Sequence, residues 1–493
     1  MKNKDHITIS SFGDESKKAI ITSISKIPFD ENASFELFYS KGSPFSDTND
    51  SSFSALKREF LRHYLLLSTE TKRDVAKSFK EVEDEVDYIL RIKLPVEKFE
   101  YFDPNAVRLW FDGKEILKLM LFEELRCECG EYVRWYLERS ENYLYIFIKG
   151  PFIDPALLKR ELKINNINID TVSIQDSENI FISDLDIRGG KYALALRGSS
   201  FVNISNCDIG KGSFVGVEIT SGIDSNTSSD HNVIDSCEID SRFRFKNYRY
   251  HSSRGSQDGV FIVGEGSYNK VLNSYIKDWG HSGINIYSND KEAVYNQFVS
   301  NRIDGDGVAY MHGFTVEGEK CKYNGFFSNF FTNLGARNQL GGVENAVYKN
   351  YFGNIYNSQV KKDQGYGSGQ GIWLQTFAKR NYISENIFIG CDEAAISLVS
   401  FGNDGIKEKN TISRNFIINC GMRIFNKPYN NCVIEIYDKD DKRIRENNFI
   451  NNRVFLKDAT PLIYYHGEEY TLEEFNAQIG RYGDFIIGNL SIK

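Results

Sequence analysis

A short phrase punctuated by asparagine repeats along roughly the last two-thirds of this chain of 493 residues. Each copy has an Asn, a short apolar pair, a second Asn five residues after the first, and a further apolar run. Clear copies start at Asn296, Asn324, Asn345, Asn381 and Asn410, and weaker copies start at Asn179, Val202, Asn232, Asn269 and Lys442. A period of twenty to forty residues is typical of a solenoid, in which each coil packs on its neighbours.

The repeats consist of short strands. Segments such as Val260-Phe-Ile-Val, Ile284-Asn-Ile-Tyr and Ile396-Ser-Leu-Val alternate with period two, and Gly, Asn, Asp and Ser separate them. An inward Asn can hydrogen-bond to its equivalent one coil away, so a ladder of Asn satisfies polar groups that would be costly to bury alone. The pattern predicts an all-β protein: a right-handed parallel β-helix of about ten coils over residues 161–493.

Residues 1–160 do not share the repeat and are predicted to form a separate capping subdomain. Helical spacing and charge pairing within 53–90 predict a helical segment. Apolar segments beginning at Val107 and Tyr143 predict strands, with a turn at Asp112-Gly113. We therefore expect a β-rich N-terminal subdomain that contains some helix.

The composition excludes several partners. The formal net charge of −8 argues against a nucleic-acid or anionic-membrane partner, because no excess of positive charge is present. No run of eighteen apolar residues predicts a membrane helix. The N-terminus has no apolar signal region, so we expect a cytoplasmic protein for the chain as written, and a secreted one if a signal is missing from it. The sequence does not indicate an oligomeric state.

Several segments resemble bacterial β-helix carbohydrate-active proteins. Ile7-Thr-Ile-Ser-Ser-Phe-Gly, Phe111-Asp-Gly-Lys, Trp135-Tyr-Leu and Leu144-Tyr-Ile-Phe precede the first coil in the order found in that group. The segment from Tyr470 is similar to the one that closes their last coil. The group includes glycoside hydrolases of the xylosidase and fucosidase kinds, so the resemblance implies a β-helix and a carbohydrate substrate. Its motifs are architectural and do not identify the sugar.

Outward residues of neighbouring coils form columns, so residues about one period apart are expected to be neighbours in space. We aligned the strand after Gly (Ala in the last coil) on Val260, Ile284, Phe314, Val343, Ile372 and Ile396. The alignment predicts one outward column of Phe261, Asn285, Thr315, Glu344, Trp373 and Ser397, and a second of Val263, Tyr287, Glu317, Ala346, Gln375 and Val399. This surface is richer in polar and aromatic residues than a solvated face requires.

Candidate catalytic residues gather at this strand. Asp258, His281 and His312 precede it on three successive coils. Hydrolysis of a glycosidic bond needs one carboxyl group to protonate the leaving oxygen and another to act as nucleophile or to activate water. Glu317, with either Glu344 or Asp258, is predicted to supply the pair. As the alternative, Asp258 is a turn residue before Gly259 and the two histidines are structural.

Substrate contacts are predicted around the same surface. Trp373 suits stacking on a sugar ring, and Tyr287, Asn285 and Gln375 point outward in the predicted columns. Two longer excursions, at 240–257 and 356–370, are expected to wall the groove, because long loops on a rigid scaffold often carry the binding function. Within the first excursion, the predicted substrate contacts are Tyr250 and Arg254.

Three functions stay open. The leading hypothesis is a glycoside hydrolase acting on a polysaccharide or its oligosaccharides, with no cofactor. A polysaccharide lyase acting on a uronate-containing glycan would use His281, His312 and Arg254, often with calcium. A non-catalytic glycan-binding β-helix is the third. The Asn-Thr-Asp, Asp-Asp and Gly-His-Gly set of polygalacturonases and the Arg-x-Pro-x-x-Arg signature of pectate lyases are absent.

Overall fold

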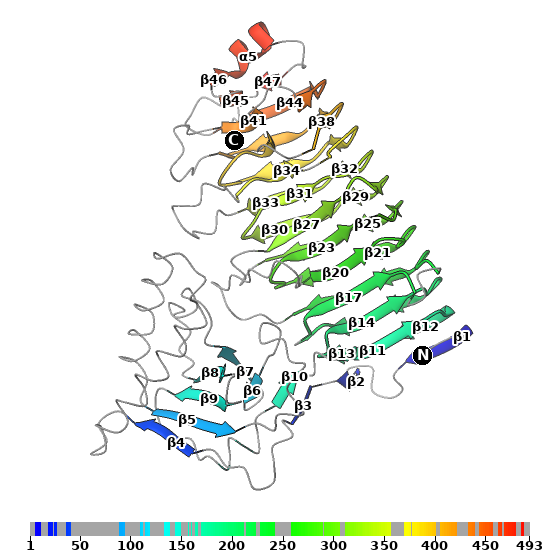
Figure 1. Cartoon of the computed structure of the whole chain (residues 1–493). Coiled ribbons are helices and arrows are strands. Elements are labelled where there is room, and N and C mark those ends of the chain that lie inside the picture. Colours follow the sequence, from blue (N-terminus) through cyan, green and yellow to red (C-terminus); the bar gives the residue numbers. More distant parts are fainter. Residues whose placement is uncertain are drawn as a thin grey trace, which may run out of the picture. The chain divides into compact units, whose positions relative to one another are not determined.

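The computed structural model describes most of the chain from Ile169 onward and isolated segments before it (Figure 1). The described residues are 5–10, 18–22, 24–26, 36–40, 88–93, 109–111, 114–118, 133–138, 143–148, 156, 159, 163–165 and 169–487, the last range with gaps at 212, 223–226, 242–257, 289, 306–310, 356–368, 376, 401–404, 422–431, 439–442, 457–461, 466–467 and 480–484.

The chain divides into two compact units, residues 1–21 with 170–493 and residues 22–169. The predicted capping subdomain, residues 1–160, therefore differs from the observed second unit at both ends. The first 21 residues belong with the repeats, and the unit continues to residue 169. β1 (Asp5–Ser10) pairs in parallel with β12 (Glu178–Ser183), so β1 extends one sheet of the β-helix by one strand.

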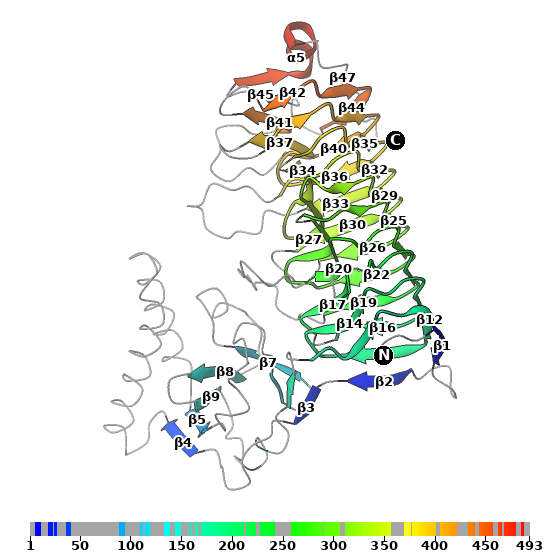
Figure 2. The same ribbon diagram turned by 45° about the vertical axis from the view of Figure 1, so that its right-hand side comes forward.

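The first unit is a parallel β-helix with three long sheets, shown from two sides in Figures 1 and 2. Sheet A contains β11 (Val172–Gln175), β14 (Tyr192–Arg197), β17 (Val215–Thr220), β20 (Asp258–Val263), β23 (Ser282–Tyr287), β27 (His312–Glu317), β31 (Asn338–Leu340), β34 (Ile372–Leu374), β37 (Ile396–Ser400), β41 (Cys432–Asp438), β45 (Leu462–Tyr465) and β46 (Glu468–Thr471). Sheet B contains β1, β12, β15 (Asn203–Ser205), β18 (Val233–Asp235), β21 (Lys270–Leu272), β25 (Gln297–Val299), β29 (Gly325–Phe327), β32 (Ala346–Tyr348), β35 (Tyr382–Ser384), β39 (Thr411–Ser413) and β43 (Asn448–Ile450). Sheet C contains β2 (Ala19–Thr22), β13 (Leu185–Arg188), β16 (Asp208–Ile209), β19 (Glu238–Asp240), β22 (Tyr275–Lys277), β26 (Arg302–Asp304), β30 (Phe330–Leu334), β33 (Tyr351–Ile355), β36 (Ile387–Ile389), β40 (Phe416–Ile418), β44 (Asn452–Phe455) and β47 (Phe485–Ile487).

Short elements complete this unit. β24 (Ala293–Val294) pairs with β28 (Cys321–Lys322), and β38 (Lys407–Glu408) pairs with β42 (Ile444–Arg445). Helix α5 (Leu472–Ile479) follows β46, which pairs antiparallel with β45. The prediction of an all-β parallel β-helix is confirmed.

The second unit contains one mostly antiparallel sheet. Its strand order is β3 (Ile24–Lys26), β10 (Lys163–Asn165), β6 (Leu109–Phe111), β7 (Lys114–Lys118), β8 (Val133–Glu138), β9 (Tyr143–Ile148), β5 (Tyr88–Lys93) and β4 (Glu36–Ser40). The prediction of strands near residues 107 and 143 is confirmed. Most of the predicted helical segment 53–90 lies outside the described residues, and its last three residues belong to β5, which pairs antiparallel with β9.

Two internal Asn ladders run through the β-helix core. The first contains Asn232, Asn269, Asn296, Asn324, Asn345, Asn381, Asn410 and Asn447, and the second contains Asn301, Asn329, Asn350, Asn386, Asn415 and Asn452. In a typical step, both the backbone N–H and the Nδ2 of Asn329 donate to Asn350 Oδ1, at 2.8 and 3.0 Å. The copy predicted to start at Lys442 in fact starts at Asn447, because Asn447 and Asn452 occupy the two ladders.

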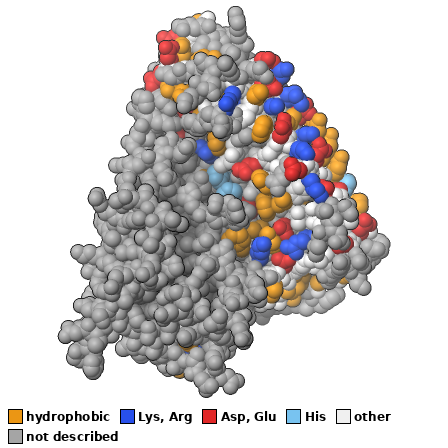
Figure 3. Space-filling view, viewed as in Figure 1, with side chains coloured by type: hydrophobic (Ala, Val, Ile, Leu, Met, Phe, Trp, Pro, Cys, Tyr) orange, Lys and Arg blue, Asp and Glu red, His pale blue; other side chains and the backbone are white. Residues whose placement is uncertain are grey.

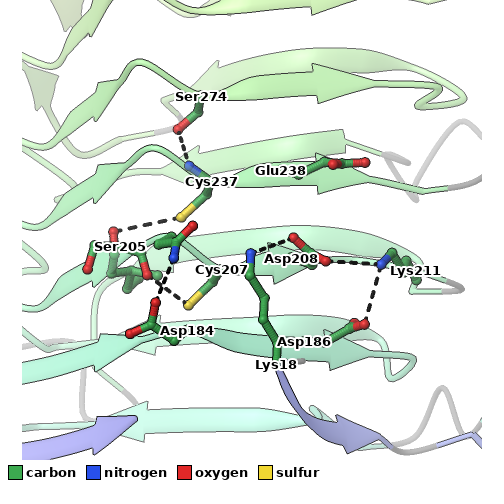
Figure 4. Close-up of polar contacts among 12 residues, drawn as sticks. Lys18, Asp184, Asp186, Ser205, Cys207, Asp208, Lys211, Cys237, Glu238 and Ser274 are labelled. Atoms are coloured by element: carbon green, nitrogen blue, oxygen red, sulfur yellow. Dashed lines mark hydrogen bonds and ion pairs between the residues drawn. The ribbon is translucent and has the colours of Figure 1, made fainter. Parts of the chain in front are cut away.

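The second ladder changes its chemistry in the first coils. Cys207, Cys237 and Ser274 stand in successive coils before Asn301, and Ser274 Oγ accepts the Cys237 backbone N–H at 3.1 Å (Figure 4). The six described cysteines are buried and free. A small buried thiol thus replaces Asn where the ladder begins.

An ion-pair network joins the N-terminal segment to the coils above it. Lys18 Nζ lies 2.8 Å from Asp208 Oδ1, and Lys211 Nζ lies 3.3 Å from both Asp208 and Asp186 (Figure 4). These contacts, with the β1–β12 pairing, attach residues 5–10 and Lys18 to the first coils. Among the described helices, none is long and apolar enough to cross a membrane.

Candidate active site

The strand pairing of sheet A defines the outward column. From Ala195 upward it reads Glu218, Phe261, Asn285, Thr315, Gln339, Trp373, Ser397, Glu435 and Tyr464. The predicted column is therefore correct at Phe261, Asn285, Thr315, Trp373 and Ser397. At the coil between Thr315 and Trp373 it is wrong, because Gln339 takes the place assigned to Glu344.

Glu344 is displaced because the register slips in the shortest coil. It directly precedes the ladder residue Asn345, with a left-handed φ of 56°. The residues before the equivalent ladder positions, Tyr295 and Tyr323, have the same conformation. Glu344 accepts a hydrogen bond from Arg380 Nε at 2.5 Å, and this contact lies at a turn away from sheet A. Glu344 therefore does not lie in the outward column of sheet A, where it was predicted.

The second predicted column has a similar correction. Val263, Tyr287 and Glu317 are paired on successive strands as expected. Ala346 lies instead in β32 of sheet B, and the backbone N–H groups of Gly341 and Gln375 continue the column by bonding to Val316 and Leu340. Gln375 keeps its predicted place, beside Glu317.

Asp258 and His281 form a hydrogen-bonded pair. The Asp258 side chain has no exposed area, whereas the His281 side chain is 33% exposed. His281 Nδ1 lies 2.8 Å from Asp258 Oδ1, and Asn285 Nδ2 donates to the other oxygen, Asp258 Oδ2, at 3.0 Å. Because a carboxylate oxygen accepts, the proton of a neutral His281 sits on Nδ1 and Nε2 is the basic nitrogen.

Local backbone geometry places Asp258 at this face. Gly259 follows it, and a Cβ on that glycine would lie 2.5 Å from the core atom Ile276 Cγ2. Gly283 stands one coil above, where a Cβ would lie 2.7 Å from Ile303 Cγ2. Glycine therefore allows the chain to press onto the core immediately after Asp258 and immediately after Ser282.

His312 is held by its neighbours through both ring nitrogens. Its Nδ1 donates to the carbonyl oxygen of Arg337, and Gln339 Nε2 lies 3.4 Å from its Nε2. The rings of His281 and His312 are 5.3 Å apart and meet edge to face. The three residues Asp258, His281 and His312 thus come together as the sequence predicted, although His312 makes the contacts of a supporting residue.

Trp373 is less accessible than the sequence suggested. Only 9% of it is exposed, and the guanidinium carbon of Arg337 lies 3.5 Å from the centre of its ring. One face of the indole is therefore covered by a cation. Trp373 packs beside the site and leaves little exposed surface for the predicted stacking on a sugar.

The surroundings shift the pKa values of Glu317, His281 and His312 in different ways. Burial raises the pKa of Glu317, and the charge of Asp258 adds to that shift, while His281 and a hydrogen bond from Gln375 oppose it. Burial alone would lower the pKa of His281, but the charge and hydrogen bond of Asp258 and the charge of Glu317 outweigh it, so the pKa is raised. Burial, together with the positive charges of His281 and Arg337, holds the pKa of His312 well below its usual range.

The outer face of sheet A is a buried polar layer. Glu218, Asn285, Thr315, Gln339, Ser397 and Glu435 all point outward from the helix and are each at most 7% exposed. Three buried amide oxygens in the layer, Asn285 Oδ1, Gln339 Oε1 and Gln375 Oε1, have no hydrogen-bond partner among the described residues. A buried acceptor without a partner costs about 1–3 kcal/mol, so the layer holds polar groups that do not serve the stability of the fold.

A second acidic residue in this layer is fully engaged. Glu218 Oε2 lies 2.8 Å from Arg197 Nη2, and Arg197 also binds Asp170. Burial raises the pKa of Glu218, while Arg197 and a hydrogen bond from Tyr192 oppose the rise. Because its carboxylate is held by Arg197 and Tyr192, Glu218 serves structure rather than proton transfer.

On the face seen in Figure 3, histidine side chains (pale blue) lie close to acidic and apolar ones. Tyr287, which pairs between Val263 and Glu317 on sheet A, has 36% of its surface exposed. Tyr250 and Arg254, and most of the excursions 240–257 and 356–370, lie outside the described residues. Among the described residues, no group of three or more His, Cys, Asp or Glu side chains is arranged to hold a metal ion.

Sequence reasoning missed Arg337 and Gln339, which contact Trp373 and His312. The signal that finds them is the ladder itself. The residue just before the first ladder Asn is a turn residue in each coil, so Glu344 is excluded by its position before Asn345. The strand of that coil then has to lie further upstream, at Asn338–Leu340.

A family model agrees with the observed fold. The family model of a right-handed β-helix region matches residues 160–352. No curated protein matches the chain. Among solved structures, a catalytic domain of a GH87 α-1,3-glucanase in complex with tetrasaccharides has a TM-score of 0.40 at 13% identity, over 65% of this chain and 57% of that one.

Two further structures are similar at the same level. The pre-mature gene product 12 of bacteriophage phi29 has a TM-score of 0.37 at 14% identity, over 62% of this chain and 48% of that one. An alginate lyase from Paenibacillus sp. str. FPU-7 has a TM-score of 0.32 at 13% identity, over 64% of this chain and 92% of that one. This chain spans about half the length of the phage protein and of the glucanase domain, at 48% and 57%. The resemblance to β-helix proteins is confirmed at the level of the fold.

Proposed function

We propose that this protein hydrolyses glycosidic bonds in a polysaccharide or its oligosaccharides on the outer face of sheet A. One observation carries the proposal: the fully buried Asp258 holds the partly exposed His281 beside Glu317, a second carboxyl group with a raised pKa. Hydrolysis of an acetal needs one group that donates a proton and one that accepts it, placed together.

In this proposal the two groups that face the substrate are a carboxyl group and an imidazole, in place of two carboxylates. Asp258 has no exposed area and is hydrogen-bonded to His281 and Asn285. We therefore assign Asp258 as a positioning residue that acts through His281. A buried carboxylate on Nδ1 fixes the ring orientation and favours the protonated imidazole.

The opposite charges of the two groups assign the proton donor. Burial raises the pKa of Glu317, the charge and hydrogen bond of Asp258 raise the pKa of His281, and each group favours the charged form of the other. We therefore assign an ionised Glu317 and a protonated His281 to the active form. Glu317 is then the base and His281 is the acid.

In the proposed step, Glu317 accepts a proton from a water molecule while the water oxygen attacks the anomeric carbon. The bond from that carbon to the leaving oxygen breaks, its electron pair stays on the oxygen, and the oxygen takes the proton from His281 Nε2. One proton enters Glu317 and one leaves His281, and exchange with solvent restores both. His312, bound by Arg337 and Gln339, keeps His281 in place by ring contact.

A lyase would use the same two groups differently. One of them would remove the proton from the carbon next to a uronate carboxylate, and the other would protonate the leaving oxygen. Two acidic side chains, Asp258 and Glu317, act on His281 at this face. The two cations described at this face are already engaged, His281 with Asp258 and Arg337 with the ring of Trp373, so we favour a neutral sugar and hydrolysis.

The test is a panel of neutral and uronate-containing glycans incubated with the full chain. Hydrolysis predicts new reducing ends without an ultraviolet-absorbing double bond, and elimination predicts both. Glu317→Gln is expected to abolish the product, and the matched control Glu344→Gln, at the turn before Asn345, is expected to keep it. Glycan binding without any product, unchanged in Glu317→Gln, would instead support the glycan-binding alternative.

A further inference from the structure

Sheet C carries an apolar surface on its outer face that the catalytic proposal does not use. Strand pairing aligns Arg302, Phe330, Tyr351, Ile387, Phe416 and Arg453 in one outward column. Phe330 is 55% exposed, Ile387 39% and Phe416 37%. Together with the half-buried Ile389, Ile418 and Phe455, the column forms what we call the apolar stripe: Phe330, Tyr351, Ile387, Ile389, Phe416, Ile418 and Phe455.

The same column is charged in the preceding coils. It reads Asp186, Asp208, Glu238, Tyr275 and Arg302. These charges pair locally, as in Lys277 with Glu238 at 3.0 Å and Arg302 with Asp304 at 2.8 Å. The outer face of this one sheet, whose strands from β16 to β44 form a row in Figure 2, therefore changes from a charged half to an apolar half. A contiguous exposed apolar patch with a polar border is typical of a protein interface.

We propose that a second copy of this chain binds the apolar stripe, with the two β-helices antiparallel and a two-fold axis passing through Ile387. An isologous interface brings residue i against j and j against i, so the stripe must complement its own reverse. Reversed about Ile387, the column places Tyr351 against Phe416 and Phe330 against Arg453 of the second copy.

The reversed pairs are chemically matched. Tyr351 and Phe416 make an aromatic pair, and Arg453 is a cation that already lies 5.4 Å from the centre of the Phe416 ring. Phe330 would offer Arg453 a second ring across the interface. In a parallel dimer each residue would face its own equivalent, so Arg453 would meet Arg453. Charge and ring placement therefore favour the antiparallel arrangement.

The size of the apolar stripe limits the expected affinity of the dimer. Five strands about 4.8 Å apart make it about 20 Å long. A standard interface buries about 800 Å² per partner, and a stripe of this length reaches that figure only with its polar border. We expect a reversible dimer with a dissociation constant in the micromolar range rather than a permanent one.

Sedimentation velocity of the full chain across about 0.5–200 µM tests the proposal directly. We expect a concentration-dependent monomer–dimer equilibrium, and Ile387→Lys is expected to weaken it about 100-fold because two like charges meet on the axis. The matched control is Ile450→Lys, a residue 42% exposed on sheet B, which is expected to leave the equilibrium unchanged. A wild type that stays monomeric throughout overturns the proposal.

Two charge variants test the direction of packing. Phe330→Glu places a carboxylate against Arg453 of the second copy and is expected to dimerise at least about 10-fold more tightly than Phe330→Lys. A parallel dimer predicts equal weakening by both, because each charge would meet itself. Equal weakening, or equal dimerisation, therefore overturns the antiparallel arrangement.

A cysteine at the axis provides an independent readout. Ile387→Cys is expected to give a disulfide-linked dimer on non-reducing gels, because a two-fold axis brings a residue next to its own copy. Ile450→Cys is the control and should stay monomeric. If the wild type is monomeric and Phe416→Ala loses retention on an insoluble polysaccharide, the stripe is a glycan surface and the proposal fails.

Discussion

The interior Asn ladders and the outer layer of sheet A both bury polar side chains, but they satisfy them differently. In the ladders each Asn repeats its neighbour, so every step offers the same donor and acceptor, as in Asn329 with Asn350. In the outer layer, neighbouring coils carry different side chains, and the amide oxygens of Asn285, Gln339 and Gln375 have no partner among the described residues. Repetition marks a structural role, and its interruption marks the candidate site.

The same contrast predicts how each region contributes to the free energy of unfolding. A satisfied ladder step contributes stability, because removing one Asn strands the groups that it served. A buried carboxyl group with a raised pKa, such as Glu317, opposes folding at neutral pH. Substitutions in the ladders are therefore expected to lower stability, and substitutions in the outer layer are expected to lower activity.

The largest expected effect comes from Glu317→Gln. Loss of the base is expected to lower the rate of glycan cleavage about 1000-fold, within the range typical of general acid–base catalysis. The free energy of unfolding is expected to stay the same or rise, because a neutral amide replaces a buried acid. Steady-state kinetics and urea unfolding measure the two quantities. A variant that loses stability and keeps its activity would reverse the contrast.

The next effect is structural. Asn329→Ala leaves the Phe298 carbonyl and the Asn301 amide groups without their partners. Each buried group without a partner costs about 1–3 kcal/mol, so we expect a loss of about 3 kcal/mol or more in the free energy of unfolding. Activity measured well below the unfolding temperature is expected to change less than 3-fold, roughly 0.6 kcal/mol in barrier height. A ladder variant that keeps full stability would contradict the structural role.

A smaller effect concerns the pH dependence of stability. The folded-state pKa of His312 lies well below 6.5, so below about pH 6.5 the unfolded chain binds more protons at this residue. Stability is therefore lost as the pH falls from about 6.5 toward the folded pKa, by at most about 1.4 kcal/mol per pH unit. His312→Asn retains a donor for the Arg337 carbonyl and removes the titration. Urea unfolding at pH 7 and pH 5 is expected to show a smaller loss in this variant than in the wild type.

The smallest effect is expected at Glu344. Its side chain is about one-third exposed and bonds to Arg380 at a surface turn. Exposed ion pairs contribute little, so Glu344→Gln is expected to change the free energy of unfolding by less than about 0.5 kcal/mol and to leave activity intact. A loss of activity comparable to that of Glu317→Gln would return Glu344 to the site.

Much of the fold was predictable because the ladder residues are visible in the sequence. The Asn spacing and the period-two strands identify the β-helix, and the grouping of Asp258, His281 and His312 follows from counting coils. The register failed at Glu344 because neighbouring coils there differ most in length, so an alignment on apolar residues slipped. The burial of Asp258 and the cover of Arg337 on Trp373 depend on side-chain packing, which a spacing argument does not contain.

The pH dependence of glycan cleavage in Asp258→Asn tests the central claim most directly. Asp258 raises the pKa of His281, and His281 must be protonated to act as the acid. Activity in the wild type is therefore expected to fall below the raised pKa of Glu317 and above the raised pKa of His281. In Asp258→Asn the alkaline limb is expected to move to lower pH, because His281 loses both the charge and the hydrogen bond of Asp258, and the acid limb is expected to move in the same direction, because Glu317 loses the charge of Asp258. An alkaline limb that stays in place would contradict the assignment of His281 and Asp258.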